Sequence, residues 1–251
     1  MAWYGPAGQR IYYESTGSGE PVLMMPGWGG RITDLNRLRH EIGPGSRVIA
    51  ADLPGSGNSE PQPRDYPASF YLDDARRLLG LLDEVGVDSA HLVGFSDGGE
   101  TALLIAALEP RRVKSVVTWG AAGQVVAAPG SLDALEHLVD DPSESFIRLA
   151  AYLVDSYGVQ NARAMAASWA RALRAITEAG GDVSRSRATL IPCPVLLMAG
   201  TYDPFCPPRL VREMADAVPA GRYLEIPGGH DLHNSDLRVV ATAIADWLSD
   251  H

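Results

Sequence analysis

Short runs of apolar residues alternate along this chain with longer stretches in which apolar residues recur every three or four positions. A short apolar run between turn-forming residues is typical of a strand buried on both faces, whereas the longer spacing indicates a helix with one buried face. The predicted strands are at 10–14, 22–25, 47–51, 90–95, 113–119, 195–199 and 223–226. This alternation predicts an α/β fold with a mainly parallel sheet flanked by helices.

Helices are predicted between several of these strands, at 70–85, 98–108 and 237–248. In the first of them, Ala75, Leu79 and Leu82 recur at helical spacing and share one apolar face. The second ends before Pro110, because proline cannot continue a helix.

The segment 121–188 breaks the alternation, because its apolar residues recur only at helical spacing and it contains no convincing strand. It is also much longer than one crossover between parallel strands requires. We therefore expect a helical cap over the carboxyl edge of the sheet, although ordinary crossover helices are the alternative. The predicted organisation is a core of residues 1–120 and 189–251 with a cap at 121–188.

Composition and charge narrow the class of protein. With 251 residues, 46% of them hydrophobic, the chain can bury one sizeable core. A formal net charge of −10 provides no basic surface for nucleic acid and opposes binding to an anionic membrane. Neither a secretory signal nor a membrane-spanning run is evident, so we expect a cytoplasmic protein of unknown oligomeric state. Cys193 and Cys206 indicate neither a disulfide framework nor a metal site.

The segment Gly94-Phe95-Ser96-Asp97-Gly98 matches the pattern G-x-S-x-G. A strand that enters a helix through such a turn leaves the serine in a strained conformation with its Oγ exposed. By itself the pattern also fits a glycine-rich loop with an incidental serine. The predicted strand before it and the predicted helix after it favour Ser96 as a nucleophile.

A serine nucleophile needs a base and an orienting carboxylate, which follow it along the chain in the order acid, then histidine. His230 directly follows the last predicted strand, and His233 is its rival three residues later. Asp203 follows the strand at 195–199, where it could also be a turn-forming residue before proline. The two histidines lack a third ligand for a metal. The predicted triad is Ser96, Asp203 and His230, with no metal and no cofactor.

Two backbone amides are expected to hold the oxyanion that forms during attack. One belongs to Asp97, and the other to Trp28 in the glycine-rich loop after the strand at 22–25. That loop could instead be a flexible turn. Aromatic residues that could line an apolar substrate pocket, or belong to the core, are Trp28, Phe95, Trp119, Trp169 and Phe205.

Together these residues resemble the α/β-hydrolase superfamily over nearly the whole chain. The segment 94–99, the pair Asp203-Pro204 and the pair Gly229-His230 are similar to the biphenyl hydrolase-like group, which includes valacyclovirase.

Two positions depart from the pattern of that family. The segment 52–59 resembles the family's D-x-R-G-x-G-x-S loop, but Pro54 replaces the usual arginine. Pro26-Gly27 stands where many members have His-Gly. Neither change removes a catalytic group.

The resemblance implies a hydrolase that cleaves a small to medium ester, thioester or lactone as its small-molecule substrate. Related enzymes hydrolyse carbon–carbon bonds or act as cofactor-free haloperoxidases, and other members are receptors or non-hydrolytic biosynthetic enzymes. In valacyclovirase-like enzymes the aspartate after the nucleophile is implicated in holding the substrate's ammonium group, and Asp97 matches it. The Asp97 side chain could instead face solvent or cap its helix.

Overall fold

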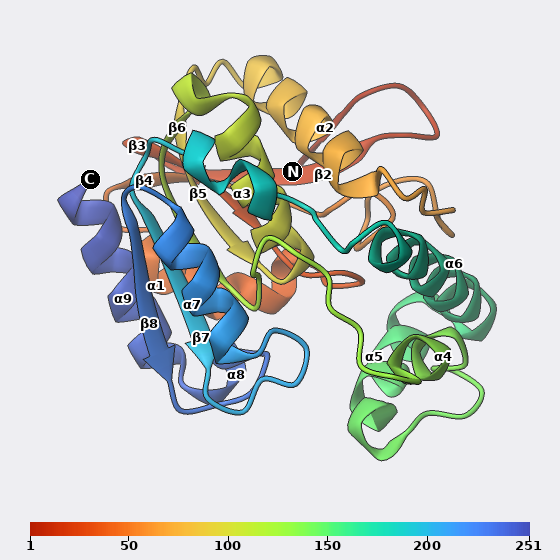
Figure 1. Ribbon diagram of the computed structural model, residues 1–251. Helices are drawn as coiled ribbons and strands as arrows, with labels where there is room; N and C mark the ends of the chain where they lie inside the picture. The colour runs from red at the N-terminus through yellow and green to blue at the C-terminus, as the bar shows by residue number, and fades with distance from the viewer.

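Eight strands form one sheet in the computed structural model, which describes residues 1–251 (Figure 1). Their order across the sheet is β1-β2-β4-β3-β5-β6-β7-β8. The pairs β1–β2 and β2–β4 are antiparallel and all other pairs are parallel, which confirms the predicted α/β fold. The strands are β1 (Ala2–Tyr4), β2 (Ile11–Gly17), β3 (Glu20–Met25), β4 (Ser46–Ala51), β5 (Ala90–Phe95), β6 (Val113–Trp119), β7 (Val195–Gly200) and β8 (Gly221–Ile226).

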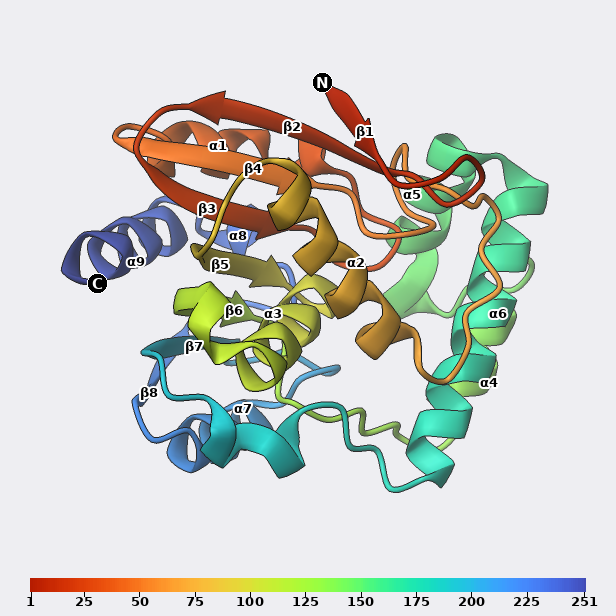
Figure 2. The same ribbon diagram turned by 90° about the horizontal axis from the view of Figure 1, so that it is seen from above.

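Helices cover both faces of this sheet (Figures 1 and 2). On one face lie α1 (Asn36–Ile42), α8 (Leu232–Ser235) and α9 (Leu237–Asp250). On the opposite face lie α2 (Phe70–Glu84), α3 (Asp97–Leu108) and α7 (Pro208–Ala217). Short 3-10 helices are η1 (Ile32–Leu35), η2 (Pro110–Arg112), η3 (Glu144–Phe146) and η4 (Arg185–Leu190).

Each face of the sheet packs into its own cluster of buried apolar residues. Successive side chains of a strand point to opposite faces, so Leu23 of β3 joins the cluster under α2 and α3. Its neighbours Val22 and Met24 join the cluster under α1 and α9. A strand buried on both faces is apolar at consecutive positions, which is why short apolar runs predicted the strands.

Residues 121–188, called here the cap segment, form α4 (Ser131–Glu136), η3, α5 (Ile147–Tyr157), α6 (Val159–Glu178) and the start of η4. The helices α4, α5 and α6 lie together beside the core (Figure 2). The two chain crossings between core and cap segment meet in a bridge between Gln124 and Asp182. The carbonyl of Gly123 also accepts the amides of residues 183–185, so both crossings are held at one point.

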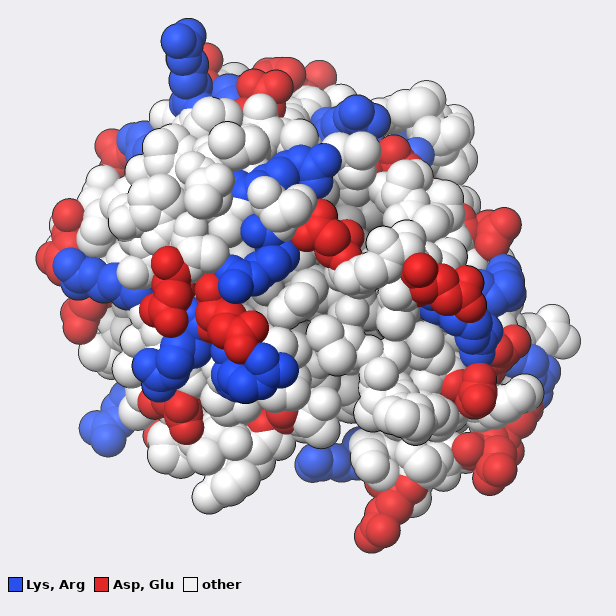
Figure 3. All heavy atoms as spheres, in the orientation of Figure 1, with Lys and Arg blue, Asp and Glu red and all other residues white.

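Charged side chains of both signs are mixed on the visible face of the molecule. On the face shown in Figure 3, acidic and basic side chains lie interspersed over the core and the cap segment. None of the helices combines the length and the apolar composition that crossing a membrane requires.

Glu100, in the first turn of α3, anchors the start of the cap segment. Its Oε1 accepts the amides of Ala122 and Gly123 at 2.7 and 3.0 Å, whereas its buried Oε2 has no partner. Burial raises the pKa of this carboxyl to about 8. The ionised form is therefore disfavoured in the folded protein.

Replacing Glu100 with glutamine is expected to make the protein more stable than wild type at pH 9 and nearly unchanged at pH 5. Because the folded pKa lies above the ordinary value of 4.5, the wild type loses stability as pH rises from about 4.5 to about 8. Glutamine keeps an oxygen for both amides and cannot ionise. Urea unfolding should show a gain on the order of a few kcal/mol at pH 9.

The control for this substitution is Glu109→Gln, which removes the same charge from an exposed site at the end of α3. It should shift the unfolding free energy equally at both pH values. If Glu100→Gln behaves as this control does, the ionisation of Glu100 is not linked to folding.

Candidate active site

Ser96 lies at the sharp turn between β5 and α3. Its φ of 52° makes it the one non-glycine residue with a positive φ. The turn is so tight that a Cβ added at Gly98 would lie 2.5 Å from the carbonyl oxygen of Pro26. At Gly94 it would meet the carbonyl of Gly98. The glycines on either side of the serine are therefore required by the backbone, and Ser96 remains partly exposed.

His230 contacts Ser96 on one side and Asp203 on the other. Its Nε2 lies 3.0 Å from Ser96 Oγ, and its Nδ1 lies 2.8 Å from Asp203 Oδ2. The second carboxylate oxygen of Asp203 accepts the amides of Phe205 and Cys206 at 2.8 and 2.9 Å. Strands β5, β7 and β8 end at the same edge of the sheet, so three residues spread over 135 positions meet there.

The rival histidine, His233, lies in α8 on the side of the sheet that faces α9. It is buried, and its Nδ1 lies 3.1 Å from the indole nitrogen of Trp119. Burial lowers the pKa of His233 to about 4. Trp119, expected among the pocket residues, is instead a fully buried core residue of that face. Neither side chain is hydrogen-bonded to Ser96, although the Ser96 amide donates to the backbone carbonyl of Trp119 at 2.9 Å.

The loop after β3 packs closely against Ser96 and contains the amide of Trp28. A Cβ added at Gly27 would lie 3.0 Å from Ser96 Cβ. Residues Gly27 and Gly30 close a tight turn through a backbone hydrogen bond of 3.0 Å, with Trp28 inside it. Asp97 is the first residue of α3, where a helix leaves its amide without an intrahelical acceptor. Both amides are thus available near Ser96 Oγ.

The side chain of Asp97 is buried rather than turned to solvent. Tyr71 donates its hydroxyl to Oδ1 at 2.7 Å, and Trp169 of α6 donates its indole nitrogen to Oδ2 at 3.1 Å. Burial raises the pKa of Asp97 to about 6. The Trp169 ring also stacks on Trp28, with ring centroids 4.2 Å apart. A buried carboxylate therefore lies beside the serine, beneath one cap side chain.

Aromatic rings surround His230 on the other side. Phe205 meets it edge-on at 5.2 Å and stacks on Phe146 of the cap segment at 5.5 Å. Phe95 lies 5.1 Å from the same imidazole. The substrate contacts predicted for Trp28, Phe95, Trp169 and Phe205 remain predictions, but all four lie around the triad. Phe146 and Tyr71 were missed, because only the fold brings them there.

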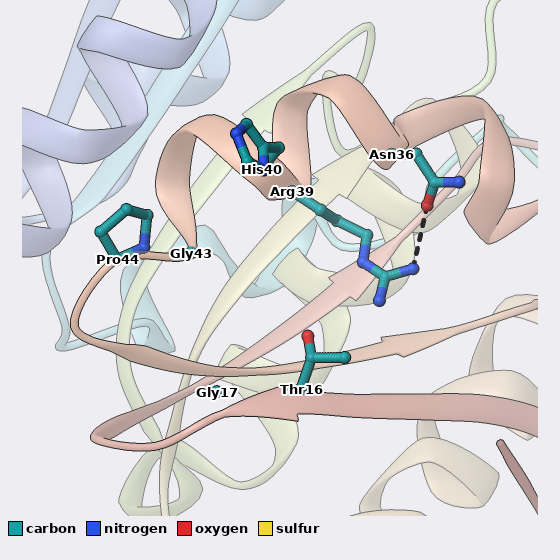
Figure 4. A pocket seen from close by; sticks show the side chains of 7 residues that line it. All are labelled: Thr16, Gly17, Asn36, Arg39, His40, Gly43 and Pro44. Carbon is teal, nitrogen blue, oxygen red and sulfur yellow. Dashed lines mark hydrogen bonds between the residues drawn. The ribbon is translucent and has the colours of Figure 1, made fainter.

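One cavity lies away from this group of residues, and a second borders it. The larger, of about 400 Å³, lies between β2 and α1 and is polar, with Arg39 already bound to Asn36 (Figure 4). The smaller, of about 110 Å³, borders Tyr71 between α2, α3 and α6. No cluster of three or more His, Cys, Asp or Glu side chains is arranged to hold a metal ion.

Comparison with known proteins identifies the family. A family model described as the alpha/beta hydrolase fold matches residues 20–152, and one described as a TAP-like protein matches residues 161–250. The human serine hydrolase BPHL is 30% identical over 237 residues, which cover 90% of this chain and 78% of that protein. The chain belongs to the α/β-hydrolase family. The predicted fold, enzyme class and resemblance to the biphenyl hydrolase-like group are confirmed.

Two further α/β-hydrolases are similar to this one. A 2-hydroxy-6-oxo-6-phenylhexa-2,4-dienoate hydrolase of Comamonas testosteroni is 38% identical over 117 residues, covering 45% of this chain and 40% of that protein. The crystal structure of an enol-lactonase from Burkholderia xenovorans superposes with a TM-score of 0.82 at 20% identity, covering 99% of this chain and all of that one. This structural likeness shows the shared fold.

Proposed function

We propose that the protein is a serine hydrolase that cleaves a small to medium ester, thioester or lactone through an acyl-enzyme. The observation that carries this proposal is the position of His230 between Ser96 and Asp203, at 3.0 and 2.8 Å. This spacing lets the imidazole take the serine proton while the carboxylate stabilises the cation that results.

The reaction then has two halves. In the first, Ser96 Oγ attacks the carbonyl carbon as His230 Nε2 takes its proton, and the amides of Trp28 and Asp97 hold the oxyanion. The bond to the leaving group breaks, and His230 gives the proton to the leaving oxygen or sulfur. In the second half a water molecule loses its proton to His230 and attacks the acyl carbon. Ser96 leaves and recovers its proton.

Turnover distinguishes this enzyme from a receptor on the same fold. A panel of p-nitrophenyl esters, thioesters and lactones should give many product molecules per protein molecule. One acylation per protein followed by arrest would favour a receptor. Cleavage of a 2-hydroxy-6-oxo-dienoate with esters untouched would favour carbon–carbon bond hydrolysis, the activity named for the Comamonas relative.

The proposed preference for amine-bearing esters rests on Asp97. Its carboxylate is buried next to the nucleophile, in surroundings where an ammonium group would lose its water and gain a fixed negative partner. Because the pKa of Asp97 is about 6, the carboxylate is ionised at neutral pH. A substrate amine with an ordinary pKa of about 8 is still protonated there. The preference should therefore be greatest between about pH 6 and 8.

Replacing Asp97 with asparagine is expected to reduce the preference for an L-valine ester over the matching isovalerate ester by about tenfold or more. The ratio of the two kcat/KM values isolates the ammonium group, because the esters share every other atom. The isovalerate ester is the control, and its kcat/KM should change much less. An unchanged ratio would show that Asp97 does not bind the ammonium.

A further inference from the structure

The turn that carries the Trp28 amide is held by the cap segment through Tyr157, the last residue of α5. The Tyr157 hydroxyl donates to the carbonyl oxygen of Gly29 at 2.7 Å and accepts the amide of Gly57 at 2.6 Å. From the core side, the amide of Gly29 donates to Ser56 Oγ at 3.1 Å. Both peptide groups of Gly29, the residue after Trp28, are therefore fixed.

The same end of α5 fits closely over this turn. Gly29 has a φ of 67°, and a Cβ added there would lie 2.7 Å from Leu153 Cδ2. Arg31 donates to the carbonyl of Ser156 at 2.8 Å and places its guanidinium 5.7 Å from the Tyr157 ring. Burial raises the pKa of Tyr157 to about 12, so its hydroxyl keeps the proton it donates at neutral pH.

A fixed Gly29 matters for the chemistry because its backbone limits how the preceding residue can rotate. The turn from Gly27 to Gly30 is closed by one backbone hydrogen bond, with Trp28 and Gly29 at its centre. A rotation of either Gly29 peptide group would therefore distort this turn, including the Gly27–Trp28 peptide whose N–H is the proposed oxyanion donor. The Trp28 ring is held from the same side by its stack on Trp169.

We propose that Tyr157 is a positioning residue for the oxyanion hole, through which α5 of the cap segment sets the direction of the Trp28 amide. This inference rests on the proposed serine hydrolase function. In this role the cap segment contributes to catalysis as well as covering the substrate, because the second oxyanion donor is correctly placed only when α5 is docked on the core. Tyr157 itself contacts no substrate atom in this role.

The test compares Tyr157→Phe with Tyr152→Phe. Tyr152 is the matched control, because it lies on the same helix and its hydroxyl donates to Asp34 at 2.6 Å rather than to a peptide group of Gly29. With p-nitrophenyl butyrate, Tyr157→Phe should lower kcat about tenfold and change KM less than about twofold. That loss is smaller than the ~10²-fold or more seen when an oxyanion donor is removed altogether. Tyr152→Phe should keep kcat within about twofold of wild type.

Two measurements separate this role from a loss of packing. The rate of fluorophosphonate labelling should fall by the same factor as kcat in Tyr157→Phe, because phosphonylation also places negative charge in the oxyanion hole. Hydrogen exchange of the amides of residues 27–30 should accelerate in Tyr157→Phe and not in Tyr152→Phe. If Tyr157→Phe does not fold, Ser56→Ala releases Gly29 from the core side and should lower kcat in the same way.

Equal losses of kcat in Tyr157→Phe and Tyr152→Phe, or no loss in either, would overturn the role of Tyr157. Failure of the underlying function has a different signature: wild type would neither turn over esters nor be labelled at Ser96. The hydrogen-exchange comparison still decides the inference in that case, because it does not depend on turnover. Unchanged exchange at residues 27–30 in Tyr157→Phe would refute it.

Discussion

Replacing Ser96 with alanine is expected to lower kcat for ester hydrolysis by about 10⁴-fold or more while leaving the fold intact. The substitution removes only the Oγ that lies 3.0 Å from His230 Nε2. Without it no acyl-enzyme can form, and the remaining rate reflects binding and the oxyanion amides alone. Steady-state kinetics and labelling with a fluorophosphonate measure the two consequences, since the label attaches to the activated oxygen.

Asp203→Asn is the companion variant for this experiment. It keeps the shape of the side chain but can present its amide nitrogen to His230 Nδ1, which would hold the imidazole in the wrong tautomer. A loss of kcat approaching about 10⁴-fold is expected, with Ser96 still in place. Retention of more than a few per cent of wild-type kcat in Ser96→Ala, or labelling at a different residue, would show that Ser96 is not the nucleophile.

The cap segment contacts both halves of the candidate site. On the oxyanion side, Trp169 stacks on Trp28 and donates to Asp97, the two residues whose amides are the proposed oxyanion donors. On the base side, Phe146 stacks on Phe205, which meets the ring of His230. Movement of the cap segment would therefore change the surroundings of the oxyanion and of the base together.

Most of the core could be predicted because consecutive apolar residues are needed where a strand is buried on both faces. The predicted strand at 113–119 has the same limits as β6, in the middle of the sheet. The strand β1 was missed, since it has three residues, lies at the edge and leaves Trp3 44% exposed. The helices α1 and α7 were also missed: α1 has only seven residues, whereas α7 had a readable signal, because Pro208 is its first residue and Leu210, Val211 and Met214 recur at helical spacing.

The candidate triad could be anticipated because each member lies within four residues after the end of a strand, and parallel strands end at one edge of the sheet. Contacts between the cap segment and the core could not be anticipated from the sequence, because they join distant residues. Tyr157 and Gly29, for example, are 128 residues apart. For Trp119, which the sequence analysis placed among the pocket residues, a local pattern pointed to the core instead. Trp119 shares a strand face with Val117, and both lie in the cluster under α9. Alternation along β6 therefore places Trp119 away from the cap segment.

Replacing Arg64 with alanine is expected to lower the free energy of unfolding by about 3–5 kcal/mol at pH 7. The Arg64 guanidinium forms two hydrogen bonds with Asp74 of α2, at 2.7 and 2.8 Å, and donates to the carbonyl of Pro54 at 2.8 Å. Both side chains are less than 10% exposed. Alanine would leave the Asp74 carboxylate buried without a counter-charge, and would leave the Pro54 carbonyl without its donor.

The double variant Arg64→Met with Asp74→Leu distinguishes this cause from simple loss of packing. Removing both charges together removes the unpaired carboxylate, so the double variant should recover most of the lost stability. Burial raises the pKa of Asp74, and the loss in Arg64→Ala should therefore be smaller at pH 5 than at pH 8, because the carboxyl can then bind a proton. Urea unfolding at both pH values measures this. A cost below about 1 kcal/mol, or a double variant no more stable than Arg64→Ala, would show that the pair stabilises the fold no more than an exposed ion pair does.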